Sequence, residues 1–329
     1  MTMRVGVIGS GFAGSTHARA CVGIDGVQVV AIAAATHEEA APLARECGAR
    51  ATASAEDLYN DPTIDLIVVA SPTYLHVTHA TAAAQAGKHV FCEKPLARTL
   101  KEADAIVGAC ERAKVTLGVG HVVRFFPEYR QAKALLDAGA LGRPGLATFT
   151  RGTFPVGKTR GWYMEEQRSG RVILDLMLHD LDTARWWFGE PDLVHARTVG
   201  GTGGLDYALA TLRYRDRPIV HLEASWAEHA GFRTSFEVRG ERGMLSHDSR
   251  ASAPLQIQAP PVEGLPAVMP ATTTHETPYR AQLRSFFDSL AAGREPVVGA
   301  REGYNSLALG LAVARAARER DVVEWKAPA

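Results

Sequence analysis

The chain has 329 residues, and its 36 Lys and Arg side chains balance 36 Asp and Glu side chains, so the formal charge at pH 7 is zero. Since a domain usually takes about 100 to 200 residues, this length predicts two domains. The neutral charge gives no electrostatic basis for binding nucleic acid or a membrane surface.

The amino-terminal segment gives no indication of export. Residues Met1 to Val5 run straight into an apolar strand, without the basic segment, apolar stretch and cleavage site of a secretory leader. The apolar runs are too short to span a bilayer. The cysteines are scattered, without a zinc-binding spacing, which predicts reduced thiols, a cytoplasmic location and no metal. These cysteines are Cys21, Cys47, Cys92 and Cys110.

The first third of the chain alternates short β-branched runs with alanine-rich helical stretches. This pattern predicts a parallel sheet with helical crossovers. Five strands are expected, at Arg4 to Ile8, Val27 to Ala33, Ile64 to Ala70, His89 to Cys92 and Thr116 to Gly120.

The pattern changes near Phe126, where strands begin to follow one another through hairpin-type turns instead of helices. We therefore predict an α/β protein with a dinucleotide-binding domain over 1–122. A second, α+β domain with a largely antiparallel open sheet is expected over 123–329. Five prolines between Ala259 and Pro278 predict an extended surface loop, and two helices follow it.

A glycine-rich turn lies where the first predicted strand ends and the first helix begins. In this position the pattern G-x-G-x-x-G is typical of dinucleotide binding. The first glycine permits the turn, the second lets the backbone approach a pyrophosphate, and the third lets the helix pack closely on the strand. We expect cofactor contacts from Gly9, Gly11, Phe12, Ala13 and Gly14.

The segment after the second predicted strand bears on the choice between NAD and NADP. Folds of this type often carry an acidic residue there, which binds the ribose 2'-hydroxyl. This chain has apolar residues from Ala31 to Ala35 instead, followed by Thr36 and His37. No Arg or Lys is present to bind a 2'-phosphate, but no carboxylate at the strand end repels one. The prediction is NAD or NADP, with a lean toward NADP and contacts from Thr36 and His37.

Two further groups of residues are candidates for catalysis. Glu93, Lys94 and Pro95 follow a strand at the carboxyl edge of the parallel sheet, where open α/β folds bind their ligands. A predicted helix from Gly170 to Asp182 places Asp175 and His179 one turn apart. A carboxylate beside an imidazole favours acid–base chemistry near neutral pH.

The ordered set of motifs resembles the Gfo/Idh/MocA oxidoreductases over nearly the whole chain. It comprises Gly9 to Gly14, Ser71 to His76, Glu93 to Pro95, His121 to Phe125 and Gly170 to Asp182. The resemblance implies a Rossmann domain, then an α+β domain whose open sheet often contacts a partner subunit. It also implies a catalytic group of Lys94, Asp175 and His179, and cofactor contacts from Ser71, Pro72, His76, Glu93 and Lys94.

The expected reaction is hydride transfer between a nicotinamide and a carbon bearing a secondary hydroxyl, on a sugar, cyclitol or related polyol. His179 would act as base, Lys94 would stabilise charge on the oxygen, and Asp175 would orient the imidazole. Substrate contacts are expected from His121, Arg124, Trp162, Asp175 and His179.

Two alternatives remain open. One is a catalytically silent NAD(P)-binding sensor or regulator, because a fold does not determine an activity. The other is reduction of an imine or enone on the same scaffold. The expected partners are a small polyol or sugar-like molecule and further copies of the chain, as a homodimer or homotetramer.

Overall fold

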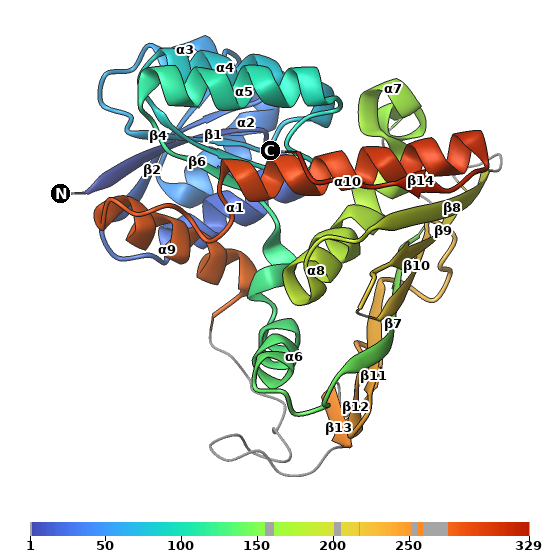
Figure 1. Ribbon diagram of the computed structural model, residues 1–329. Coiled ribbons are helices and arrows are strands. Elements are labelled where there is room, and N and C mark those ends of the chain that lie inside the picture. The colour runs from blue at the N-terminus through green and yellow to red at the C-terminus, as the bar shows by residue number, and fades with distance from the viewer. Residues whose placement is uncertain are drawn as a thin grey trace. The chain divides into compact units, whose positions relative to one another are not determined.

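A computed structural model describes residues 2–154, 161–200, 205–216, 218–251, 255–258 and 276–328, with only the backbone described at 255–258. These residues fall into two units. The first lies within 1–122 and 275–304, and the second within 123–274 and 305–329. Figure 1 shows the elements of each unit.

The first unit is built on a parallel six-stranded sheet of order β3-β2-β1-β4-β5-β6. Its inner strands are apolar and buried on both faces, as strands covered by helices on each side must be. The strands are β1 (Met3–Ile8), β2 (Val27–Ala33), β3 (Arg50–Thr52), β4 (Leu66–Val69), β5 (His89–Cys92) and β6 (Leu117–Val119).

Helices cover both faces of this sheet. Helices α4 and α5 lie on one face, and α1 and α9 lie on the other (Figure 1). The helices of this unit are α1 (Phe12–Val22), α2 (His37–Cys47), α3 (Glu56–Tyr59), the short η1 (Thr73–Leu75), α4 (His76–Gln85), α5 (Leu100–Ala113) and α9 (Pro278–Ala291).

The strand order reverses between β1 and β4, so the crossovers on the two sides of this point run in opposite directions along the sheet. Ligands of open α/β sheets bind at such a reversal, just outside the carboxyl ends of the strands. The segments after β1, β4, β5 and β6 all leave the sheet at this edge.

The second unit is built on an eight-stranded sheet of order β13-β12-β11-β7-β10-β9-β8-β14. All neighbouring strands are antiparallel except β7 and β10, which are parallel. The strands are β7 (Pro144–Gly152), β8 (Leu193–Gly200), β9 (Asp206–Arg213), β10 (Ile219–Ser225), β11 (Arg233–Gly240), β12 (Gly243–Asp248), β13 (Leu255–Gln258) and β14 (Val323–Glu324).

One face of this second sheet is covered by helices, and alternate side chains of β9 and β10 are buried and exposed accordingly. Tyr129 and Trp187 pack their rings on Phe236, in the core between helices and sheet. The helices are the short η2 (Val122–Phe125), α6 (Pro127–Asp137), η3 (Gly161–Met164), α7 (Glu166–Ser169), the π-helical turn η4 (Ile173–Met177), α8 (Leu178–Phe188) and α10 (Ala300–Glu319).

The predicted fold class is confirmed, since a parallel sheet with helical crossovers is followed by a mostly antiparallel sheet. The domain ranges differ in one segment, because 275–304 groups with the first unit and not with the second. Leu283, Phe286 and Phe287 of α9 belong to the core formed by β1, β2 and α1. The apolar stripe of an amphipathic helix does not say which sheet it covers.

The short strands β3 and β14 are not evident from the sequence, since runs of two or three residues carry too little pattern. Residues 259–275 of the predicted loop lie outside the described residues. No helix in the described ranges has the length and apolar character needed to cross a membrane.

Candidate active site

The glycine turn connects β1 to α1 and shows why each glycine is required. Gly9 has a φ of 109°, and a Cβ there would lie 2.4 Å from the carbonyl oxygen of Ala70. A Cβ on Gly14 would lie 1.9 Å from the carbonyl oxygen of Gly9, so only glycine allows the helix to pack this close to the turn. These two glycines shape the turn.

Gly11 differs from both, because a Cβ there would meet no atom within 4 Å. It is the N-cap of α1, and no side chain caps the helix at this end. The first N–H groups of α1 are thus left to a ligand, and the absence of a side chain leaves space for one. Phe12 is 64% exposed beside this space. These features fit the pyrophosphate of a dinucleotide.

The loops after β4 and β5 are tied together by a buried histidine. Nδ1 of His76 lies 2.9 Å from the carbonyl oxygen of Pro95, and Nε2 lies 3.0 Å from that of Ser71. Burial lowers the pKa of His76, and this outweighs the two carbonyl oxygens, which raise it. His76 therefore acts as a brace between the segment containing Pro72 and the turn containing Lys94.

Lys94 is half-buried directly after β5, and its peptide bond to Pro95 is cis. Its backbone N–H donates to Oε2 of Glu93 at 2.9 Å. Oε1 of Glu93 lies 2.6 Å from Nε2 of His17, which is fully buried in α1. Burial raises the pKa of Glu93, but the hydrogen bond and charge of His17 and the charge of Lys94 outweigh it, and the net pKa is lowered. Glu93 thus anchors the Lys94 turn to the helix that begins at the glycine loop.

The remaining predicted residues of the first unit lie at the same edge of the sheet. Ala13 is in the first turn of α1, and Thr36 and His37 are exposed after β2. His121 follows β6 and is 1% exposed. The structure therefore collects the predicted cofactor residues of this unit around the carboxyl ends of its strands.

In the second unit, the segment that carries Asp175 and His179 is almost wholly enclosed. Every residue from 172 to 188 is buried except three, which are half-buried: Asp175, His179 and Trp186. The three lie along the stripe expected from helical spacing. This stripe is where the segment reaches the surface of its unit, and it carries an acid and an imidazole.

Asp175 lies in the π-helical turn η4, which leads directly into α8 at Leu178. The sequence predicts an ordinary helix here and gives no sign of the wider turn. Such π-turns are rare and occur often at functional sites, because they shift a side chain out of its regular helical position. The carbonyl oxygen of His179 accepts a hydrogen bond from Oγ1 of Thr183 at 2.8 Å.

Two buried ion pairs fix the rotation of α8. Asp180 accepts two hydrogen bonds from Arg151 of β7, at 2.9 Å from Nε and 2.7 Å from Nη2, and both side chains are at most 3% exposed. Nη2 of Arg151 also donates to the hydroxyl of Tyr129 at 3.2 Å. This pair holds the sheet-facing side of the helix.

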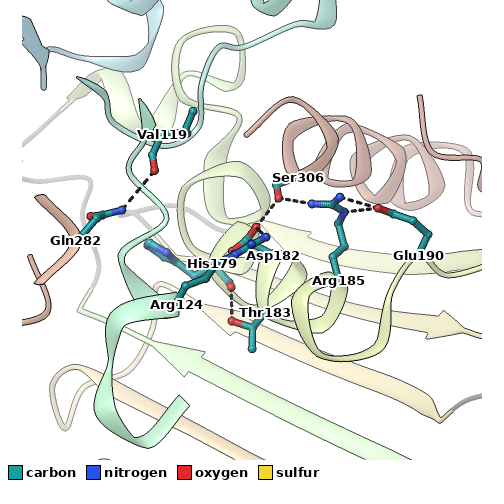
Figure 2. Close-up of polar contacts among 9 residues, drawn as sticks. All are labelled: Val119, Arg124, His179, Asp182, Thr183, Arg185, Glu190, Gln282 and Ser306. Atoms are coloured by element: carbon teal, nitrogen blue, oxygen red, sulfur yellow. Dashed lines mark hydrogen bonds and ion pairs between the residues drawn. The ribbon is translucent and has the colours of Figure 1, made fainter. Parts of the chain in front are cut away.

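The second pair holds another side of α8 (Figure 2). Arg124 donates from Nε and Nη2 to the two carboxylate oxygens of Asp182, both at 2.8 Å, and its guanidinium lies over the ring of Trp186 at 5.8 Å. Ser306 of α10 donates to Oδ1 of Asp182 at 2.6 Å. Arg185 donates to the Ser306 hydroxyl at 2.9 Å, which extends the network along the helix.

Arg124 was expected to bind substrate. In the structure it is 6% exposed and bound in bidentate fashion to Asp182, so it acts on the helix that carries His179. Trp162 is half-buried in η3, where its ring lies against that of Tyr163 with centroids 4.1 Å apart. Among the described residues, no group of three or more His, Cys, Asp and Glu side chains could hold a metal ion.

Several of these residues are not found by sequence reasoning. His17, Arg151 and Ser306 lie outside the motifs, and each pairs with a motif residue far away in the chain: Glu93, Asp180 and Asp182, respectively. The only available signal is the presence of charged residues in a largely apolar run, as at Asp180 and Asp182 on either side of Leu181. A buried charge requires a partner, but the sequence does not name it.

Comparison with known proteins gives matches along most of the chain. Residues 3–121 match the family described as "Oxidoreductase family, NAD-binding Rossmann fold", and residues 129–246 match "GFO/IDH/MocA C-terminal domain". The 1,5-anhydro-D-fructose reductase of Ensifer adhaerens is 29% identical over 334 residues, which cover 98% of each chain. An inositol 2-dehydrogenase of Acidothermus cellulolyticus is 31% identical over 314 residues, covering 92% of this chain and 89% of the relative.

Among solved structures, a levoglucosan dehydrogenase in complex with NADH and levoglucosan is similar with a TM-score of 0.88. It is 25% identical, and the similarity covers 98% of this chain and 99% of the other. The likeness therefore extends over both units.

Proposed function

The chain belongs to the Gfo/Idh/MocA family of oxidoreductases, as its motifs indicate, and on that premise we propose that it transfers a hydride between a nicotinamide dinucleotide and a carbon bearing a secondary hydroxyl. The observation that carries this proposal is the stripe of Asp175 and His179, which are half-buried on a segment that is otherwise enclosed. Titratable groups at the one accessible stripe of a buried helix are candidates for proton transfer.

The proposed substrate is a cyclic polyol or sugar. Relatives are named for inositol, anhydrofructose and levoglucosan, which all present ring hydroxyl or keto groups. A carboxylate and an imidazole side by side can bind two neighbouring hydroxyl groups through directed hydrogen bonds. His121 and Trp162 are proposed to contact the same substrate, through hydrogen bonding and through contact with the apolar face of the ring, respectively.

The dinucleotide supplies or accepts the hydride at C4 of its nicotinamide. In the oxidative direction Nε2 of His179 accepts the hydroxyl proton, and Asp175 holds that imidazole or a neighbouring hydroxyl in place. The ammonium of Lys94 stabilises negative charge that develops on the reacting oxygen. Glu93, through its bond to the backbone N–H of Lys94, fixes the turn from which that ammonium extends.

The proposal is tested with a panel of polyols, together with a ketone and an imine, and with two variants. Lys94→Ala and His179→Ala should each lower kcat by about 10²- to 10⁴-fold while the affinity for nucleotide changes little. Lys101→Ala and His229→Ala serve as matched controls, since both side chains are exposed. The assigned role is wrong for any variant that keeps near wild-type turnover.

Other outcomes distinguish the alternatives. Tight nucleotide binding without turnover of any panel compound would favour a sensor. Turnover confined to the imine would favour an imine reductase. Turnover of a polyol that is lost in His179→Ala is the result expected for the proposed dehydrogenase.

Assembly of several copies is part of the proposal. Three apolar side chains are between 43% and 68% exposed close together on β8 and β9: Val199, its strand neighbour Tyr207, and Leu209 two residues along β9. An apolar patch of this kind is typical of a protein interface. Sedimentation of the purified protein should give a dimer or tetramer, and replacement of Leu209 by Asp should shift it toward the monomer.

A further inference from the structure

The carboxyl end of β2 carries information about which dinucleotide this chain selects. In a sheet of this strand order, the adenosine ribose of a bound dinucleotide lies at the end of the second strand. The inference below therefore rests on the proposed dehydrogenase function. It concerns the loop from Ala34 to Thr36 and the first turn of α2.

Thr36 was expected to help bind a 2'-phosphate, but its hydroxyl is used within the helix start. Thr36 is the N-cap of α2, and its Oγ1 accepts a hydrogen bond from the backbone N–H of Glu39 at 3.2 Å. The Thr36 hydroxyl therefore already serves as the cap of this helix.

The first turn of α2 is acidic and exposed. It contains Glu38 and Glu39, which follow Thr36 and His37 directly. The pKa of Glu38 is lowered, chiefly by its own backbone N–H and next by the Thr36 hydroxyl, so this carboxylate is charged at neutral pH. The charge of two carboxylates exceeds the partial positive charge of about half a unit at the helix N-terminus.

The segments that follow β1, β2 and β3 at this edge of the sheet carry no cation to offset that charge. Residues 9–14, 34–39 and 53–56 contain no Arg or Lys. Arg19 lies in the last turn of α1 and Arg50 begins β3, so both lie toward the opposite edge, where they pair with Glu46 and Asp61. A 2'-phosphate placed here would face negative charge without a cation to offset it.

We propose that Glu38 and Glu39 make this chain selective for NAD by repelling the 2'-phosphate of NADP. A phosphate monoester carries about −1.5 to −2 charges at pH 7, whereas the ribose 2'-hydroxyl of NAD carries none. In this chain, Glu38 and Glu39 in the first turn of α2 take the place of the acidic residue that usually stands at the end of the second strand. The absence of a carboxylate at Ala34 therefore does not make NADP the favoured cofactor.

The test is a fluorescence titration with NADH and, separately, NADPH. The wild-type protein should bind NADH at least about tenfold more tightly than NADPH. The double variant E38Q/E39Q should reduce this ratio about tenfold, mainly through tighter binding of NADPH. Glu56→Gln is the matched control, because Glu56 is also an exposed first-turn residue but belongs to α3. It should leave the ratio unchanged.

A second measurement needs no variant. Raising the ionic strength shortens the range of charge repulsion, to about 8 Å at 0.15 M. The ratio of the two affinities should therefore fall as KCl is raised, because repulsion of NADPH weakens while NADH lacks the 2'-phosphate.

The possible failures are distinguishable. If the wild-type protein binds NADPH as tightly as NADH or more tightly, the inference is wrong but the proposed function stands. The same holds if E38Q/E39Q is folded and leaves the ratio of NADH to NADPH affinity unchanged. Failure to bind either nucleotide would overturn the proposed function and this inference with it.

Discussion

The glycine turn of the first unit and the η4–α8 segment of the second unit prepare a site in different ways. In the turn, the backbone forms the site. The three glycines are needed because a side chain at Gly9 or Gly14 would clash with the backbone, and a side chain at Gly11 would fill the space left for a ligand. In η4–α8, the useful groups are side chains, and their direction depends on buried ion pairs with β7 and η2 and on a hydrogen bond from Ser306 of α10. The first kind of site is encoded locally, whereas the second depends on the whole unit being folded.

The largest effect is expected at Asp180, which tests whether the η4–α8 segment depends on its buried ion pairs. Asp180→Ala leaves the guanidinium of Arg151 buried without its carboxylate, which should lower the free energy of unfolding by about 3 to 5 kcal/mol. Urea denaturation measures this effect. Asp137→Ala is the control, because its ion pair with Lys133 is exposed and should contribute less than about 1 kcal/mol. Equal losses in the two variants would show that the buried pair has no special role.

A functional test of the same contrast uses Arg124. Because it positions the helix bearing His179, Arg124→Ala should lower kcat about 10²-fold with less change in KM. Arg124→Lys should recover part of the loss only, since lysine cannot form the bidentate pair with Asp182. A variant that raises KM and leaves kcat intact would instead indicate direct contact with substrate.

Two alanine substitutions test the glycine turn, the other region of this comparison. Gly11→Ala adds a methyl group to open space, so the melting temperature should hardly change while the affinity for NADH falls about tenfold. Gly14→Ala forces a shift away from the Gly9 carbonyl and should also lower the melting temperature. Calorimetry and nucleotide titration separate the two effects. Equal melting temperatures would contradict the packing role of Gly14.

The smallest expected effect concerns pH. The pKa of Glu93 is lowered in the folded protein, so its ionisation stabilises the fold above the ordinary glutamate pKa of about 4.3. That stabilisation is lost as the pH falls through the lowered value. The melting temperature of Glu93→Gln should therefore lie below that of the wild type at neutral pH and approach it below about pH 4. A constant difference across this range would contradict the assignment.

Much of the first unit follows from the sequence, because strand and helix runs, the glycine turn and Glu93-Lys94-Pro95 are all local patterns. The stripe of Asp175 and His179 also follows from helical spacing. The partners of buried charges do not, since Arg151 and Asp180 are 29 residues apart and Arg124 and Asp182 are 58 apart. The π-turn at η4 is also not predicted from the sequence, because no residue type specifies it.

The discontinuity of the first unit has a consequence for how the protein is made. Phe286 packs on Phe91 with ring centroids 5.4 Å apart, and Tyr279 packs on His17. During synthesis, these rings reach the sheet only after strands β7 to β13 of the second sheet have left the ribosome. A nascent chain of 122 residues therefore exposes part of its apolar sheet face, and it is a candidate substrate for chaperones until α9 arrives.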